Sequence, residues 1–244
     1  MRLHHFAAAA AATIAFALAA GSASAADTLS VTYYSHASDA DFGPSQCCST
    51  SSNLVLSGLG IDGLPIYNTS ASDGGFTIHD LTAAGEINWW SGPVTGSGTV
   101  TLPIANSTMF LPNATGGNDA SGYLTAIFKG TLTLPTAENL TFHLGSDDDA
   151  FVYIDGQIVD QLGGVHPPTD APVTTSTLAA GPHTFELFYA DRDQDQAVLD
   201  FSIDTVGVTL TGVPEPATWG LMVVGVGLMG AALRRRRQQV AAIS

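Results

Sequence analysis

Two clusters of carboxylates dominate the chemistry open to this sequence. Three aspartates stand in a row within Gly145–Asp149, and three more alternate with other residues in Asp191–Asp195. Neighbouring carboxylates repel one another unless a cation or hydrogen-bond donors compensate their charge. Carboxylate oxygens are ligands that Ca²⁺ prefers, and the ion tolerates a flexible shell of roughly 6–8 oxygens. These clusters are therefore candidate calcium sites, and the alternative is that both are solvated acidic turns.

The charge balance favours cations as partners. Between residues 26 and 213 there are two basic residues, Lys129 and Arg192, against 21 acidic ones, a formal net charge of −19. Such a surface repels nucleic-acid phosphates and anionic lipid headgroups. We therefore expect no nucleic-acid partner, and divalent cations as the natural counter-charge.

Motifs of the common hydrolases are absent from the sequence. It contains no G-x-S-x-G, no H-E-x-x-H and no phosphate-binding loop, whereas a hydrolase needs an activated nucleophile or a placed acid–base pair. The abundant carboxylates leave a glycosidase pair open by residue type. We nevertheless predict a protein without catalytic activity.

The N-terminus has the features of a secretory signal peptide. Arg2 precedes an apolar core over Ala7–Ala20, and Ala23-Ser24-Ala25 matches a small-residue cleavage site. Residues 1–25 are therefore expected to be removed on export. The alternative is a membrane anchor, but the core is shorter than the ~20 residues that a span needs.

The C-terminus carries a second ordered signal. An apolar run over residues 217–233 lies between two short motifs: Pro214, Glu215 and Pro216 before it, and Arg234, Arg235, Arg236 and Arg237 after it. An apolar helix followed by arginines is typical of a stop-transfer segment. The three parts together, over residues 213–238, resemble the PEP-CTERM sorting signal.

That resemblance implies an address at the cell surface. The signal is read in its family by an exosortase-type processing enzyme at the inner membrane, which we expect as a partner. It implies a Gram-negative bacterium, at least transient membrane anchoring through the C-terminal helix, and delivery to the cell surface or to an exopolysaccharide, biofilm-type matrix. A permanent single-span anchor is the alternative.

Between the two signals the pattern predicts strands. Short apolar or alternating runs separated by Gly, Asn, Asp and Ser predict strands at 29–34, 123–134, 140–144, 151–154, 157–159, 183–189 and 197–203. Asp155-Gly156 has the residue types and spacing of a type I′ hairpin turn. Residues 92–122 and 163–180 are expected to be loops. The fold class that follows is all-β, an antiparallel sandwich or barrel.

Several strings in this region belong to one known pattern. They are Tyr123–Pro135, Leu140–Asp148, Phe151–Gly156, Asp160–His166, Leu178–His183 and Phe188–Arg192. Together they resemble the PA-14 module, and more closely its fibro-slime branch. The sequence departs from the fibro-slime pattern at Asp191, where Glu is usual, and at Ala150, where an aromatic residue is usual. The resemblance implies a PA-14-like antiparallel β-sandwich over residues 26–212.

The resemblance also implies a site. In sugar-binding members of this superfamily, adjacent aspartates bind a calcium ion that also holds sugar hydroxyls. Carried over to this sequence, it implies calcium ligands in two loops: Asp147, Asp148, Asp193 and Asp195. Three further residues are expected beside the ligand: Asp149, Asp191 and His166. For His166 and for His183 a purely structural hydrogen bond is the alternative.

Two adjacent pairs leave alternatives open. Trp89-Trp90 offers a platform for stacking a sugar, although neighbouring residues of a strand face opposite ways, which favours one of them as core. Cys47 and Cys48 could form a strained ring, pair between chains or stay reduced, and no function is assigned to them.

We therefore predict an exported cell-surface or matrix protein that binds an exopolysaccharide or other glycan in a calcium-dependent, lectin-like manner. The competing hypothesis is a structural matrix or adhesion protein whose acidic loops bind calcium only for stability.

Overall fold

The computed structural model describes residues 26–44, 48–71, 77–106, 123–193 and 197–213. Within these ranges the chain forms thirteen strands and one short 3₁₀ helix. The elements are β1 (Thr28–His36), β2 (Val55–Leu59), β3 (Pro65–Tyr67), η1 (Asn88–Trp90), β4 (Val94–Thr101), β5 (Ile104–Asn106), β6 (Tyr123–Leu134), β7 (Glu138–Asp147), β8 (Asp149–Ile154), β9 (Gln157–Leu162), β10 (Thr169–Leu178), β11 (Gly181–Asp191), β12 (Val198–Ile203) and β13 (Thr209–Gly212).

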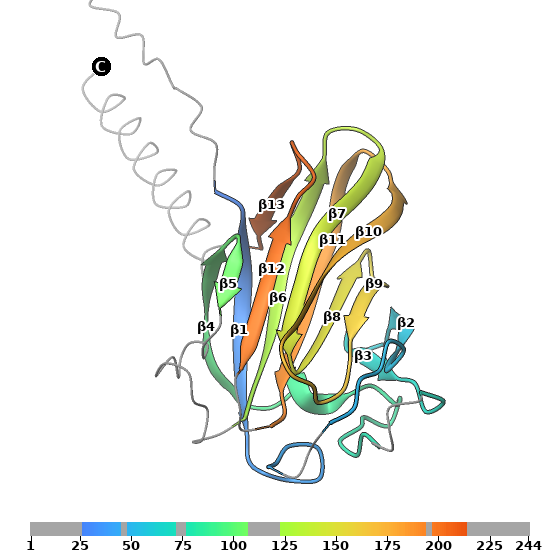
Figure 1. Ribbon diagram of the computed structural model, residues 1–244, viewed down its shortest axis with the longest axis vertical. Coiled ribbons are helices and arrows are strands. Elements are labelled where there is room, and N and C mark those ends of the chain that lie inside the picture. Colours follow the sequence, from blue (N-terminus) through green and yellow to red (C-terminus); the bar gives the residue numbers. More distant parts are fainter. Residues whose placement is uncertain (1–25, 45–47, 72–76, 107–122, 194–196, 214–244) are drawn as a thin grey trace, which may run out of the picture.

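The strands form two sheets that pack face to face (Figure 1). The larger sheet has the order β3-β2-β9-β8-β11-β6-β1-β4, with β13 also paired to β6, and the smaller has the order β10-β7-β12-β5. All of these pairs are antiparallel. The prediction of an all-β antiparallel sandwich is confirmed.

Apolar side chains cover both faces of the larger sheet. Between the sheets, Leu187 belongs to the same core cluster as Phe142 and Phe201 of the smaller sheet. On the outer face, Trp90 packs its ring edge-on against Phe188, with 5.1 Å between the centroids. Because β8 is covered on both sides, all six of its residues are buried, which explains the apolar run over residues 150–154 that follows Asp149.

Two segments predicted as loops contain strands. Residues 163–180 include β10, an edge strand of the smaller sheet, and an edge position tolerates Pro172 because its missing N–H is not needed on the open side. Residues 92–122 include β4, an edge strand of the larger sheet, and the short β5, an edge strand of the smaller sheet. Both edge strands are rich in small polar residues because they are largely exposed. Residues 107–122 lie outside the described residues.

The turn between β8 and β9 is the predicted hairpin. Asp155 and Gly156 have φ of 51° and 70°, and Ile154 pairs with Gln157 across them. Positive φ at both central residues is the requirement of a type I′ turn. This prediction is confirmed.

The two ends of the described domain lie together. The N–H of Leu210 donates to the carboxylate of Asp27 (2.7 Å), and the N–H of Gly212 donates to Thr28 Oγ1 (3.3 Å). Both contacts lie at the upper end in Figure 1, where β1 begins and β13 lies. The opposite end carries the turn from β7 to β8 and the end of β11.

Both predicted signals lie outside the described residues. These are residues 1–25 and the sorting-signal residues Pro214, Glu215, Pro216 and Arg234–Arg237. Across the ranges that the structure describes, no helix has the length and apolarity to cross a membrane. Cys48 is disulfide-bonded, so the reduced state considered for it is wrong, and Cys47 lies outside the described residues.

Candidate functional site

Three consecutive aspartates form the turn between β7 and β8. β7 ends at Asp147, β8 begins at Asp149, and the peptide bond between Asp147 and Asp148 is cis. All three residues are buried, with exposed fractions of 5%, 1% and 0%. The carbonyl oxygen of Asp147 accepts a hydrogen bond from the hydroxyl of Tyr189 on β11. The larger sheet therefore holds this turn through Tyr189 of β11.

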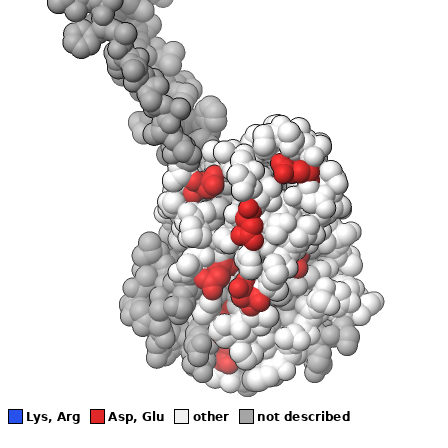
Figure 2. All heavy atoms as spheres, turned by 45° about the horizontal axis from the view of Figure 1, so that its top comes forward, with Lys and Arg blue, Asp and Glu red and all other residues white. Residues whose placement is uncertain are grey.

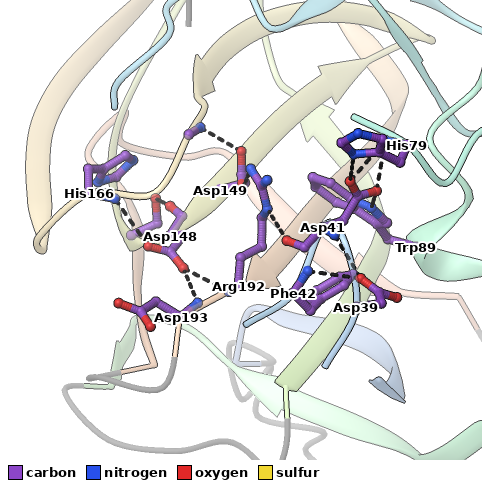
Figure 3. A network of polar contacts seen from close by, with 12 residues as sticks. Asp39, Asp41, Phe42, His79, Trp89, Asp148, Asp149, His166, Arg192 and Asp193 are labelled. Carbon is purple, nitrogen blue, oxygen red and sulfur yellow. Dashed lines mark hydrogen bonds and ion pairs between the residues drawn. The ribbon is translucent and has the colours of Figure 1, made fainter. Parts of the chain in front are cut away.

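Asp148 gathers backbone N–H groups from two loops (Figure 3). Its Oδ1 accepts from the N–H of His166 (3.1 Å), and its Oδ2 accepts from the N–H groups of Arg192 (2.7 Å) and Asp193 (3.0 Å). Its side chain also shares a hydrogen bond with that of Asp147. Burial raises the pKa of Asp148, although these hydrogen bonds oppose the rise. Two carboxyl groups can share a hydrogen bond only when one carries a proton.

Asp149 points to the other side of the turn, toward Arg192. Its Oδ1 accepts from the N–H of Gly164 (2.7 Å), and its Oδ2 lies 3.5 Å from Nη1 of Arg192. Burial raises the pKa of Asp149 to about 6, even though the guanidinium of Arg192 and the N–H of Gly164 lower it. Asp149 is thus held by a hydrogen bond and an ion pair within the protein.

A further buried carboxylate, Asp41, lies on the far side of Arg192. It accepts hydrogen bonds from the N–H of Asp80, from Nε1 of Trp89, and from both the N–H and Nδ1 of His79, at 2.9–3.2 Å. Burial alone would raise the pKa of Asp41, but these hydrogen bonds together hold it below its ordinary value. A hollow of about 220 Å³ lies beside it, lined by Asp39, Ala40, Asp41, His79 and Asp80.

The structure brings most of the predicted site residues together. Asp147, Asp148 and Asp149 form the turn, and the N–H groups of His166 and Asp193 donate to Asp148. The ring of His166 is hydrogen-bonded through Nδ1 to the carbonyl of Pro167 (3.0 Å). Asp191 is buried at the end of β11. Asp195 lies outside the described residues.

The tryptophan pair does not form a stacking platform. Trp89 and Trp90 lie on η1, not on a strand, and both are buried, with exposed fractions of 0% and 2%. Nε1 of Trp90 donates to the carbonyl of Tyr189 (2.9 Å), while Trp89 packs beneath Arg192. The stacking platform considered for this pair is wrong, because a 3₁₀ turn directs both rings into the outer core of the larger sheet.

Asp147 and Asp148 have the donor chemistry that calcium requires. A carboxylate offers about four acceptor positions, and Asp148 uses them for three N–H donors and the hydrogen bond with Asp147, so a cation would take the place of that last hydrogen bond. Within the described ranges, no three or more His, Cys, Asp or Glu residues are arranged as a metal-binding group. A complete calcium shell there would therefore need oxygens from beyond these residues, such as Asp195 or a ligand.

Sequence reasoning missed the Asp41 cluster and the support that Arg192 gives. Asp41 and Arg192 are 151 residues apart, yet Nε of Arg192 donates to the carbonyl of Asp41 (2.9 Å). Neither stands in a recognisable motif with the other. The one available signal was the scarcity of basic residues, which makes each of them worth placing.

Curated relatives match this chain over limited lengths. The chain is 27% identical over 188 residues to protein psiR of Dictyostelium discoideum, a match that covers 62% of this chain and 18% of psiR. It is 39% identical over 54 residues to protein psiB of the same organism, covering 21% of this chain and 10% of psiB. The matches thus span less than a fifth of the length of either relative.

Solved structures with similarity to the chain include two PA14 domains and one adhesin domain. A PA14 sugar-binding domain from an RTX adhesin is 16% identical with a TM-score of 0.37, covering 76% of this chain and 95% of that chain. The PA14 domain of the MpAFP antifreeze protein is 12% identical with a TM-score of 0.35 and coverages of 77% and 92%. The epithelial adhesin 9 A domain from Candida glabrata, in complex with Galb1-4GlcNAc, is 13% identical with a TM-score of 0.33 and coverages of 75% and 85%.

Two family models match the sequence itself. The PEP-CTERM protein-sorting motif matches residues 212–237, which confirms the predicted sorting signal. The PA14 domain matches residues 89–212, just over half of the chain, and β1 and β2 add strands to the same larger sheet from outside that range. The chain belongs to the PA14 domain family.

Proposed function

We propose that this is an exported protein of the cell surface or extracellular matrix whose PA14 domain binds glycan through calcium held at Asp147 and Asp148. The match to the PEP-CTERM motif supports export, surface display and processing by an exosortase-type enzyme. Membership of the PA14 family supports a non-catalytic binding domain. Asp193 and Asp195 on the neighbouring loop are the further candidate ligands.

The hydrogen-bonded carboxyl pair of Asp147 and Asp148 is the observation that carries this proposal. Sharing a proton is how two buried carboxyl groups relieve their repulsion when no cation is present. A bound calcium ion would supply the charge in place of that proton and open coordination positions for vicinal hydroxyls. The N–H groups of His166, Arg192 and Asp193 hold Asp148 in one orientation, so the pair is ordered in advance.

The surroundings suit a hydroxyl-rich ligand. A hollow of about 70 Å³ adjoins the turn and is lined by Gly145, Ser146, Pro168, Thr169, Asp170, Val198 and Asp200. Figure 2 turns the upper end of Figure 1 forward and the end with the carboxylate turn away, and on this face the described residues show acidic side chains and no Lys or Arg. Such a face accepts hydrogen bonds from neutral sugar hydroxyls and attracts cations, but it disfavours an acidic glycan in the absence of a cation.

The placement of the turn suits a surface-attached protein. Asp191 pairs with Leu124 at one end of the sandwich, and Leu210 pairs with Leu132 near the other. Leu132 lies eight steps along β6 from Leu124, or about 27 Å at the usual rise per residue. The carboxylate turn therefore lies at the opposite end from residue 213, where the chain enters the sorting motif.

The test is thermal unfolding of the full chain in mild detergent, with calcium and with chelator. Calcium at 100 times its Kd would add about 2.7 kcal/mol of stability. Asp147→Asn should abolish this gain. It is a cleaner probe than Asp148→Asn, because Asp148 also holds three backbone N–H groups. No calcium-dependent shift at millimolar calcium would refute the proposal.

A second candidate function is favoured by those same N–H groups. Asp148 already serves as a structural acceptor for two loops, so a cation there could act only to stabilise a matrix protein. A glycan array probed with the full chain in calcium and in chelator separates the two. Calcium-dependent retention on glycans, lost in Asp147→Asn, supports the lectin-like function, whereas a stability gain without retention supports the structural one.

A further inference from the structure

Arg192 occupies a position that demands an explanation. It is one of two basic residues between 26 and 213. The other, Lys129, lies at the surface in an ion pair with Glu186 (2.6 Å), whereas Arg192 is 0% exposed. Removing a guanidinium from water is costly unless charges and hydrogen bonds compensate it. One of the two basic side chains in this region is therefore buried in the interior of the domain.

The guanidinium joins three separate parts of the fold (Figure 3). Nε donates to the carbonyl of Asp41 (2.9 Å), and Nη1 lies 3.5 Å from Oδ2 of Asp149. Cζ lies 4.8 Å from the ring centroid of Trp89, within the range of a cation–π contact. Trp89 is in turn tied to Asp41 through its Nε1 (3.0 Å). A planar fork with several donors suits this arrangement, whereas the single ammonium of a lysine does not.

The main chain of the same residue faces the candidate site. The N–H groups of Arg192 and Asp193 both donate to Oδ2 of Asp148, at 2.7 and 3.0 Å. The side chain therefore fixes the end of β11 against the Asp41 loop, while the backbone presents two adjacent donors to the carboxylate turn. Residue 193 is also the last described residue before the loop that carries Asp195.

We propose that Arg192 is the positioning residue of the Asp147–Asp148 site. By clamping the end of β11 to Asp41 and Trp89, its side chain holds the two N–H donors where Asp148 needs them and sets the start of the second acidic loop. It contacts no ligand itself. The consequence for calcium affinity rests on the proposed function, but the clamp can be measured on the calcium-free protein.

Hydrogen exchange on the full chain in mild detergent, with chelator present, tests the clamp directly. Arg192→Met should speed exchange at the amides of positions 166, 192 and 193 at least tenfold. The amides of Leu210 and Gly212, at the other end of the sandwich, should exchange at the wild-type rate. Wild-type protection at 166, 192 and 193, or an equal acceleration at both ends, would overturn the proposal.

A matched control and a milder variant keep the test decisive. Leu210→Ala removes a buried side chain at the far end and should show the reverse pattern, with faster exchange near Gly212 only. If Arg192→Met does not fold, Arg192→Lys keeps the charge and loses the fork. Its amides at 166, 192 and 193 should exchange at least threefold faster, and wild-type rates there would overturn the proposal.

Calorimetric titration with CaCl₂ then separates the two ideas. Arg192→Met or Arg192→Lys should weaken binding about tenfold or threefold, while Leu210→Ala leaves the Kd unchanged at a temperature where it is folded. Equal affinity in wild type and the Arg192 variants overturns the positioning role. No binding by the wild type refutes the proposed function alone, because the exchange pattern decides the clamp independently.

Discussion

Two buried carboxyl groups on either side of Arg192 have pKa values that are shifted in opposite directions. Asp41 accepts hydrogen bonds from His79, Asp80 and Trp89, and its pKa lies below the ordinary value in spite of burial. Asp148 accepts three backbone N–H groups and shares a hydrogen bond with a second carboxyl group, and its pKa lies above the ordinary value. Burial is similar in both, with exposed fractions of 1%.

The two pKa shifts differ in direction because the groups next to Asp41 and Asp148 differ. The hydrogen bonds that Asp41 accepts outweigh the effect of its burial, so the protein's own donors stabilise this carboxylate. Asp148 has like charges on either side along the chain, so the protein's own donors leave the turn short of positive charge. Compensation by an outside cation is useful only at the second kind of site. This contrast supports the proposed cation site at Asp147 and Asp148 and a supporting role for Asp41.

The largest effect is expected at Asp41. Asp41→Asn keeps the shape but replaces one acceptor oxygen with a donor that faces the N–H groups of Asp80 and Trp89. Hydrogen bonds to a charged group contribute about 1.5–3 kcal/mol each, so we expect a loss of about 2–4 kcal/mol in the free energy of unfolding, measured by urea denaturation in chelator.

Asp39→Asn is the matched control in the same loop. Its Oδ1 accepts from the N–H groups of Asp41 and Phe42, and an asparagine oxygen can do the same. We expect a change below about 0.5 kcal/mol. Equal losses in the two variants would contradict the view that Asp41 is special.

Asp147→Asn should behave in the opposite way to Asp41→Asn. Removing one of two repelling carboxyl groups should leave the free energy of unfolding in chelator unchanged or raise it by up to about 1 kcal/mol. In calcium the same variant should be less stable than the wild type, because the calcium-dependent gain is lost. Urea denaturation in both buffers measures the two values, and a loss above about 2 kcal/mol in chelator would make the Asp147–Asp148 pair structural.

The sequence predicted the interior of the fold better than its edges. The strand at Tyr123–Leu134 was placed at its observed bounds, because a long apolar pattern reports burial. The edge strands β4 and β10 were missed because their side chains face solvent and read as Ser- and Thr-rich loops. Their strand conformation comes from pairing with β1 and β7, which is information held in other parts of the chain.

The same division holds for the candidate site. The run of aspartates at 147–149 could be found because it is local and chemically unusual. The support at Asp41 and Arg192 could not, because it depends on a contact across 151 residues that only the sheet order creates. The burial of both tryptophans was missed for a related reason, since alternation along a strand, which would bury only one of them, was assumed where the chain forms a 3₁₀ turn.

A third carboxylate, Asp155, shows what donors achieve at the surface. It lies in the β8–β9 turn, where its Oδ2 accepts from Nδ1 of His183 (2.6 Å) and its Oδ1 accepts from the N–H of Thr184 (2.9 Å). The other ring nitrogen of His183 faces the carbonyl of Ala179 (2.9 Å). Both nitrogens therefore have acceptors, which favours the doubly protonated ring.

The pKa directions of this pair give the smallest predicted effect. The hydrogen bond with Asp155 raises the pKa of His183. Burial alone would raise the pKa of Asp155, but the hydrogen bonds from His183 and Thr184 lower it overall. The His183 contribution is complete below the unfolded pKa of about 6.5 and is lost as pH rises through the folded pKa. The Asp155 contribution is complete above about 3.9 and is lost as pH falls through the folded pKa.

Stability from the pair should therefore be greatest between about pH 4 and pH 6.5. Solvent screens the interaction, because the side chain of Asp155 is 52% exposed, so we expect less than about 1 kcal/mol. Between pH 5.5 and pH 9, the free energy of unfolding in urea should fall further for the wild type than for His183→Gln or Asp155→Asn. Parallel pH profiles for the three proteins would show that the Asp155–His183 pair adds no stability. Hydrogen-bond donors to a carboxylate would then stabilise the fold only where water is excluded, as at Asp41.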